Sequence, residues 1–123
     1  MAIKRYMATA DTTITNAFQS DLQTRGTGSN MGASDILEVF SIYGQASSSA
    51  GLSPELSRAL IKFPTTGISS DRTAGTIPAS GSVSFYLKMY NVDHARTLPK
   101  SYELLVSAVS SSWQECTGLD MEF

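Results

Sequence analysis

Apolar and polar residues alternate most regularly over Ser82–Tyr90. One parity of this segment holds the apolar residues Val83, Phe85, Leu87 and Met89. The other parity holds Ser82, Ser84, Tyr86, Lys88 and Tyr90. A period of two places each set on its own face of a β-strand, whereas a helix would scatter the apolar set around its circumference. The pattern therefore predicts a half-buried strand with one face in water.

Five further segments have weaker patterns that predict short strands. They are Thr9–Thr15, Ile36–Tyr43, Arg58–Phe63, Tyr102–Val109 and, as the start of a last strand, Met121–Phe123. The first is rich in β-branched threonine, which favours extended backbone. The second is mostly apolar, which predicts burial on much of both faces. Pro64 ends the third, because proline cannot donate a hydrogen bond to a strand ladder.

Gly, Ser, Thr and Asn dominate the segments between the predicted strands, which are therefore expected to be loops: Asn16–Ser34, Gly44–Ser57, Thr65–Gly81 and Ser110–Gly118. Within the second loop, Leu52–Arg58 allows an alternative, a single helical turn capped by Ser53 with Pro54 at the first helical position. No long segment has the pattern of a crossover helix. The sequence thus predicts an all-β protein, an antiparallel β-sandwich.

The length and composition fit one domain over residues 1–123, with residues 1–8 as an N-terminal arm. Charged residues make up 16% of the chain, the net charge is -2, and Lys and Arg are scattered. We therefore expect no nucleic-acid binding, which needs a basic patch to neutralise phosphates. The single Cys excludes an intrachain disulfide, and one Cys with one His excludes a structural zinc site within one chain.

The N-terminal residues have no long apolar run after their charges, and no stretch of the chain is apolar enough to span a bilayer. We therefore expect synthesis in a cytoplasm without a signal peptide and without membrane insertion. If the protein leaves the cell, it would do so by another route, such as lysis.

The candidate ligand sites are few, and each has a structural alternative. Trp113 is a candidate platform for stacking a sugar, but a tryptophan in this loop is equally suited to packing against the sheet. Glu115, Asp120 and Glu122 offer oxygen ligands of the kind that calcium prefers, yet their spacing matches no calcium loop. Solvated surface carboxylates explain them better, so we expect no metal and no cofactor.

Catalysis is not expected. Asp93 and His94 are adjacent in a predicted loop and are not accompanied by a recognisable nucleophile motif. Asp11 and Asp35 are better explained as turn and strand-entry residues. The glycines of Arg25–Gly32 precede a predicted strand rather than a helix, which favours turns over a phosphate cradle. Cys116 is expected to be a free thiol.

Five short motifs follow one another along the chain, and they are Ala10–Thr15, Gly28–Gly32 with Leu37–Val39, Arg58–Phe63, Ile77–Tyr90 and Ser112–Glu115. In this order they resemble the DNRLRE-type β-sandwich domain, a jelly-roll-like module of carbohydrate-binding and cell-surface proteins and of phage virion structural proteins. The resemblance covers residues 8–123, and the segment Gly118–Glu122 is more similar to the phage variants.

The resemblance implies a non-enzymatic structural protein of a tailed phage virion, in the capsid, neck, tail or a fibre. Its partners would be other virion proteins and copies of itself. Tyr86, Lys88 and Tyr90 would form the contact face, unless they are ordinary outer-face strand residues. The alternatives are a module for host-surface glycans that uses Trp113, or an accessory domain of a longer surface protein.

The family pattern continues into further strands beyond the position of Phe123. The sandwich is therefore expected to be incomplete at its C-terminal side, and its missing strands would come either from a longer chain or from a neighbouring one. Unpaired sheet edges favour strand addition, which supports an assembly.

Overall fold

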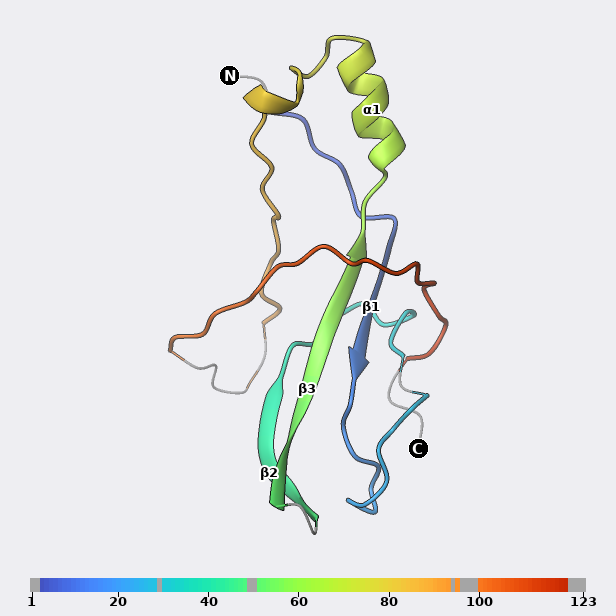
Figure 1. The fold of residues 1–123 in the computed structure, drawn as a ribbon, viewed down its shortest axis with the longest axis vertical. Coiled ribbons are helices and arrows are strands. Elements are labelled where there is room, and N and C mark those ends of the chain that lie inside the picture. The colour runs from blue at the N-terminus through green and yellow to red at the C-terminus, as the bar shows by residue number, and fades with distance from the viewer. Residues whose placement is uncertain (1–2, 29, 49–50, 94, 96–99, 120–123) are drawn as a thin grey trace.

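The computed structural model describes residues 3–28, 30–48, 51–93, 95 and 100–119 (Figure 1). Its elements in chain order are β1 (Ala10–Thr15), β2 (Ser41–Ser48), β3 (Gly51–Lys62), α1 (Thr65–Thr73) and the 3-10 helix η1 (Ser80–Ser82). The strands form one antiparallel sheet in the order β1-β3-β2. Regular structure is thus mostly strand, with one short α-helix at the end of β3.

β3 is the central strand, and its 12 residues pair with both neighbours. Its C-terminal half pairs with β1 in the register Thr12↔Leu60, and its N-terminal half pairs with β2 in the register Tyr43↔Pro54. The ladder with β2 is irregular just after Tyr43. Pro54 lacks an N–H, so a proline in a central strand is tolerated best at such an irregularity.

Hydroxyl side chains attach the segment before β2 to the sheet. The buried Thr13 Oγ1 accepts a 3.0 Å hydrogen bond from the N–H of Glu38. The buried Ser57 Oγ accepts a 2.7 Å bond from the N–H of Phe40 and donates a 2.9 Å bond to the carbonyl of Glu38. These hydroxyls satisfy backbone groups that would otherwise require a strand partner.

Few apolar side chains are fully buried in the described part of the chain. Those that are buried are Ala17, Met31 and Ile77, whereas Thr12, Thr13, Glu55 and Ser57 are buried polar residues. Large apolar side chains lie exposed along the segments after η1, including Phe85, Leu87, Met89, Leu105 and Val106. Apolar side chains left exposed in this number are a common feature of surfaces that bind another macromolecule.

Two predicted strands are confirmed. β1 covers Ala10–Thr15 of the expected Thr9–Thr15, and the end of β3 covers most of Arg58–Phe63, stopping before Pro64. The predicted loop Gly44–Ser57 is wrong, because most of it lies in β2 and β3, and the alternative helical turn at Leu52–Arg58 is wrong for the same reason. Backbone pairing between β2 and β3 outweighs the loop-like, Ser-rich composition here.

The predicted strand Ile36–Tyr43 is only partly correct, since β2 begins at Ser41. Residues 36–40 are attached mainly through the side chains of Thr13 and Ser57, together with a 3.0 Å backbone bond from the Ser57 N–H to the Phe40 carbonyl. Ile36 and Val39 are exposed, so the expected burial on both faces is wrong.

The predicted loop Thr65–Gly81 contains α1 and η1 and is therefore also wrong in part. Pro64 lies at the N-cap of α1, and Gly75 follows its C-terminus with a φ of 72°. Proline near a helix start and glycine in a left-handed conformation after its end form the usual boundary pair. Only Ile68 is a large apolar residue within α1, so the apolar periodicity that predicts helices was absent.

The segments predicted as strands at Ser82–Tyr90 and Tyr102–Val109 carry no strand assignment. The expected half-buried face is not observed either, because both parities of the first segment are largely exposed. The predicted strand Met121–Phe123 lies outside the described residues. Among the residues described, no helix is long and apolar enough to cross a membrane.

Candidate docking groove

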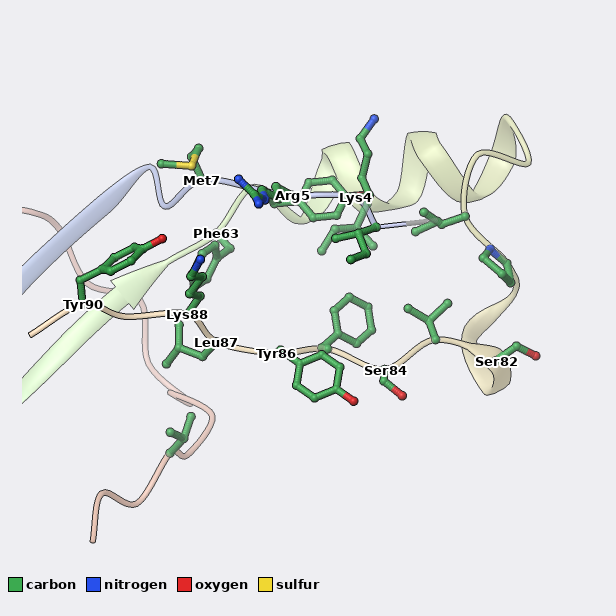
Figure 2. Close-up of a pocket in the computed structure, with 18 residues that line it drawn as sticks. Lys4, Arg5, Met7, Phe63, Ser82, Ser84, Tyr86, Leu87, Lys88 and Tyr90 are labelled. Carbon is green, nitrogen blue, oxygen red and sulfur yellow. The ribbon is translucent and has the colours of Figure 1, made fainter. Parts of the chain in front are cut away.

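An open groove of about 1380 Å³ lies between the N-terminal segment, α1 and the segment after η1 (Figure 2). One wall consists of residues 3–7, and the opposite wall consists of residues 77–78 and of 82–88 with Tyr90. Phe63, Ile68 and Val106 complete the lining. Pockets for small molecules usually measure about 300–1,000 Å³. The size and the open shape therefore suit a segment of polypeptide better than a small ligand.

Asp71 of α1 holds the N-terminal wall in place. Its carboxylate accepts a 2.7 Å hydrogen bond from the Tyr6 hydroxyl and lies 3.1 Å from the Lys4 ammonium. The hydrogen bond from Tyr6, followed by that from Lys4, lowers the pKa of Asp71 below its ordinary value. The same bond to the Asp71 carboxylate raises the pKa of the Tyr6 hydroxyl.

These shifts predict a pH window for attachment of the N-terminal wall. The pKa of Asp71 is lowered on folding. Its contribution to folding stability is therefore present above the unfolded pKa of about 3.9 and is lost as pH falls through the lowered pKa. The pKa of Tyr6 is raised on folding. Its contribution to folding stability is therefore present below the unfolded pKa of about 10 and is lost as pH rises through the raised pKa.

Asp71→Asn is expected to return the Tyr6 pKa toward its ordinary value. Ultraviolet titration against Tyr6→Phe measures this, and an unchanged Tyr6 pKa in the Asn variant would contradict the contact.

The opposite wall is an extended segment with exposed aromatic residues. Phe85 is 60% exposed, Tyr86 89% and Tyr90 78%. The Lys88 ammonium lies 4.8 Å from the centre of the Tyr90 ring, a cation–π contact. No backbone hydrogen bond joins residues 83–93 to another residue in the described ranges. The segment therefore presents both unpaired backbone groups and apolar side chains.

Tyr86, Lys88 and Tyr90, the predicted contact residues, all line this groove. They do not share one face as a regular strand would place them. In Figure 2, Tyr86 points away from the N-terminal segment, whereas Lys88 extends toward Phe63. The sequence also missed the opposite wall, because residues 1–8 were interpreted only as an arm. The mixture of apolar and basic residues in Ile3–Met7 was a signal that this arm covers a partly apolar surface.

The groove is lined by three cationic side chains, Lys4, Arg5 and Lys88, and no Asp or Glu is among its described lining residues. The Lys4 charge is offset by Asp71. Arg5 makes no hydrogen bond or ion pair with another residue in the described ranges, and Lys88 contacts the neutral Tyr90 ring. The groove thus favours an occupant with apolar and acidic side chains.

Glu115 attaches the C-terminal part of the chain to the outer edge of the sheet. Its Oε1 accepts a 2.7 Å hydrogen bond from the N–H of Asp11 in the edge strand β1. Farther along, the Gly118 N–H donates a 2.7 Å bond to Asn30 Oδ1, and Gly118 O accepts a 2.9 Å bond from the Ala33 N–H. Glu115 thus has a structural contact, and no group of three His, Cys, Asp or Glu side chains within the described ranges is placed to hold a metal.

The remaining predicted site residues are not brought into the groove. Trp113 is half-buried and lies outside the groove lining, and its role in glycan binding stays a prediction. Cys116 is an exposed free thiol, as expected. His94, Asp120 and Glu122 lie outside the described residues. The glycine-rich segment ends in a close contact, since a Cβ on Gly32 would overlap the backbone of Cys116.

A buried carboxylate at Glu55 was not anticipated from the sequence. Glu55 is 2% exposed, and its Oε2 accepts a 2.9 Å bond from the N–H of Phe18, while Oε1 has no hydrogen-bond partner within the described part of the chain. Arg25 lies over the Phe18 ring, 3.9 Å from its centre, and donates to the carbonyls of Asn16 and Pro54. This cluster attaches the connection after β1 to the start of β3.

Comparison with known proteins adds no functional assignment. The resemblance to DNRLRE-type domains therefore stays a prediction from motif order, and the functional argument rests on the groove. The chain matches no protein-family model, no curated protein and no solved structure.

Proposed function

We propose that this protein is a non-enzymatic structural component of a tailed phage virion, which acts by binding a neighbouring protein chain in the groove. The observation that carries the docking role is the unpaired, extended wall at residues 83–90, which lies in a groove lined by apolar and basic side chains. The assignment to a phage particle is supported by the motif resemblance, and the docking role is supported by the groove.

Strand addition is the binding mode that the groove favours. An extended segment with free N–H and C=O groups accepts a second strand through main-chain hydrogen bonds, and pockets beside it select the side chains. The 83–90 wall offers such a backbone, and Phe63 and Ile68 add apolar surface to the lining of the groove. Docking would bury apolar residues that the isolated chain exposes, such as Phe85 and Leu87.

The added strands would also complete the architecture that the sequence predicts. The described sheet has three strands, fewer than a sandwich requires. Residues 83–93 and 100–111 carry the apolar content of further strands but lack ladder partners in the described ranges. In this proposal, contacts with neighbouring chains convert these segments into the second sheet of an antiparallel, jelly-roll-like sandwich.

Replacing Tyr86 and Tyr90 with serine tests the contact face. We expect the double variant to weaken assembly by about tenfold or more, because exposed tyrosines at interfaces often contribute over 1 kcal/mol each. Far-ultraviolet circular dichroism should be unchanged, since both side chains are exposed. Assembly is measured by sedimentation, with other virion proteins present where the chain alone stays monomeric.

Tyr43→Ser provides the matched control, because Tyr43 is 69% exposed on β2 and lies outside the groove. The control should assemble like the wild type. Equal assembly of all three proteins would remove the groove from the proposed function.

A further inference from the structure

We infer that the groove binds the segment Leu119–Phe123 of a second copy of this chain. This inference rests on the proposed docking function and names its partner. Three observations lead to it: the charge of the groove, the pattern of the C-terminal segment, and the place where that segment is attached to its own copy.

The groove is basic and apolar. Arg5 and Lys88 contribute charges that are not offset by a carboxylate among the described residues, and the Lys4 charge is already offset by Asp71. The same lining contains apolar side chains, including Phe63 and Leu87. A complementary strand must therefore carry acidic residues interleaved with apolar ones.

The segment Leu-Asp-Met-Glu-Phe at 119–123 has this pattern in the sequence, with Leu119, Met121 and Phe123 alternating with two acidic residues. In a strand, the alternation would direct the apolar residues to one face and Asp120 and Glu122 to the other. Five residues in a strand span about 17 Å, and the eight-residue wall at 83–90 spans about 26 Å at the same rise. The wall is therefore long enough for the whole segment.

The attachment of Gly118 favours a second copy over the same copy. Gly118 is hydrogen-bonded to Asn30 and Ala33, and Glu115 is bonded to the outer edge of β1. Figure 1 shows this end of the described chain on one side of β1 and β3 and the segment 82–90 on the other side. Five residues that start beside Asn30 would have to cross both strands to enter their own groove. Docking between copies has no such constraint.

Charge reversal on each side of the contact tests the inference. Arg5→Glu/Lys88→Glu makes the groove acidic, and Asp120→Lys/Glu122→Lys makes the segment basic. Each variant alone should self-associate at least tenfold more weakly than the wild type, because like charges then face each other. Mixed in equal amounts, the two variants should form heterodimers, since each segment then meets a groove of opposite charge. Native mass spectrometry distinguishes heterodimers from homodimers.

The matched control is Arg58→Glu/Lys62→Glu, which changes the net charge equally at exposed positions of β3 outside the groove. It should associate like the wild type. In addition, a synthetic peptide with the sequence of Gly118–Phe123 should bind the wild type and lose binding to Arg5→Glu/Lys88→Glu. Circular dichroism checks that every variant is folded.

The failure of this inference is distinguishable from the failure of the proposed function. A monomeric mixture of folded variants, or a wild-type chain that stays monomeric at high concentration, overturns the pairing of copies. If the Tyr86→Ser/Tyr90→Ser variant still loses assembly with other virion proteins in that case, the docking function stands and its partner is another protein. If that variant also assembles normally, both are overturned.

Discussion

Replacing Thr13 with valine will lower the free energy of unfolding by about 1–3 kcal/mol, although valine has nearly the shape of threonine. The Thr13 side chain is 1% exposed, and its hydroxyl both accepts a bond from Glu38 N–H and donates one to Glu38 O. Valine leaves that N–H without its acceptor at a part-buried position beside Thr13. The cost of leaving such a donor unsatisfied exceeds the gain from an added methyl group.

Thr9→Val is the control for this prediction, because the Thr9 hydroxyl makes only an exposed bond, 3.3 Å from Lys62 O. We expect a change within about 0.5 kcal/mol for this variant. Urea unfolding followed by circular dichroism measures both. Equal stabilities of the two variants would show that the Thr13 hydroxyl does not hold the segment before β2. Ser57→Ala should resemble Thr13→Val, because it removes the acceptor for Phe40 N–H.

Replacing Gly32 with alanine will also destabilise the protein, by about 1–3 kcal/mol, through steric overlap. A Cβ at this position would overlap the backbone of Cys116, which has no flexible side-chain atom to move aside. The substitution must therefore push residues 116–118 away from the loop at 30–33 or distort that loop. The bonds of Gly118 to Asn30 and Ala33 would then be weakened as well.

Gly26→Ala is the matched control in the same glycine-rich segment. Its Cβ would meet only Ala17 O at 3.4 Å, which is ordinary van der Waals contact. We expect this variant to be as stable as the wild type, or slightly more stable because alanine restricts the unfolded chain. Thermal unfolding compares the two. A Gly32→Ala variant that melts with the wild type would mean that the C-terminal segment does not pack on this loop.

The parts of the fold that follow from local sequence could be predicted. β1 was found because β-branched residues favour extended backbone, and the end of β3 was found because proline stops a ladder. The single cysteine rules out a disulfide within one chain. The scattered Lys and Arg residues predict no nucleic-acid binding, which stays a prediction.

The remaining elements depend on contacts that the local pattern does not show. The Ser-rich stretch before Pro54 has no apolar alternation, and it forms strands because the backbones of β2 and β3 pair with each other. α1 lacks an apolar stripe, and its contact to Tyr6 is visible only once the chain has folded. The boundary pair Pro64 and Gly75 was the one local signal that could have revealed it.

The candidate site was predicted on one wall only. Tyr86, Lys88 and Tyr90 were proposed as contact residues because they share the predicted outer face of a strand and tyrosine is enriched at interfaces. The sequence could not identify Arg5 and Phe63 as lining residues of the same groove, because no local pattern relates residue 5 or residue 63 to residue 88. The alternation at 82–90 predicted a half-buried strand, but the structure has no strand there and both parities are largely exposed.

The composite origin of the groove has a consequence for the order of events in the cell. Its lining comes from residues 3–7, 63, 68, 77–78, 82–88, 90 and 106, so no single short stretch of nascent chain contains it. Contacts between residues more than 60 positions apart, such as Tyr6 with Asp71, form late because they must overcome the entropy of closing long loops. A chain still emerging from the ribosome therefore lacks this surface. Under the proposed docking role, only copies that have finished folding would be able to associate through the groove.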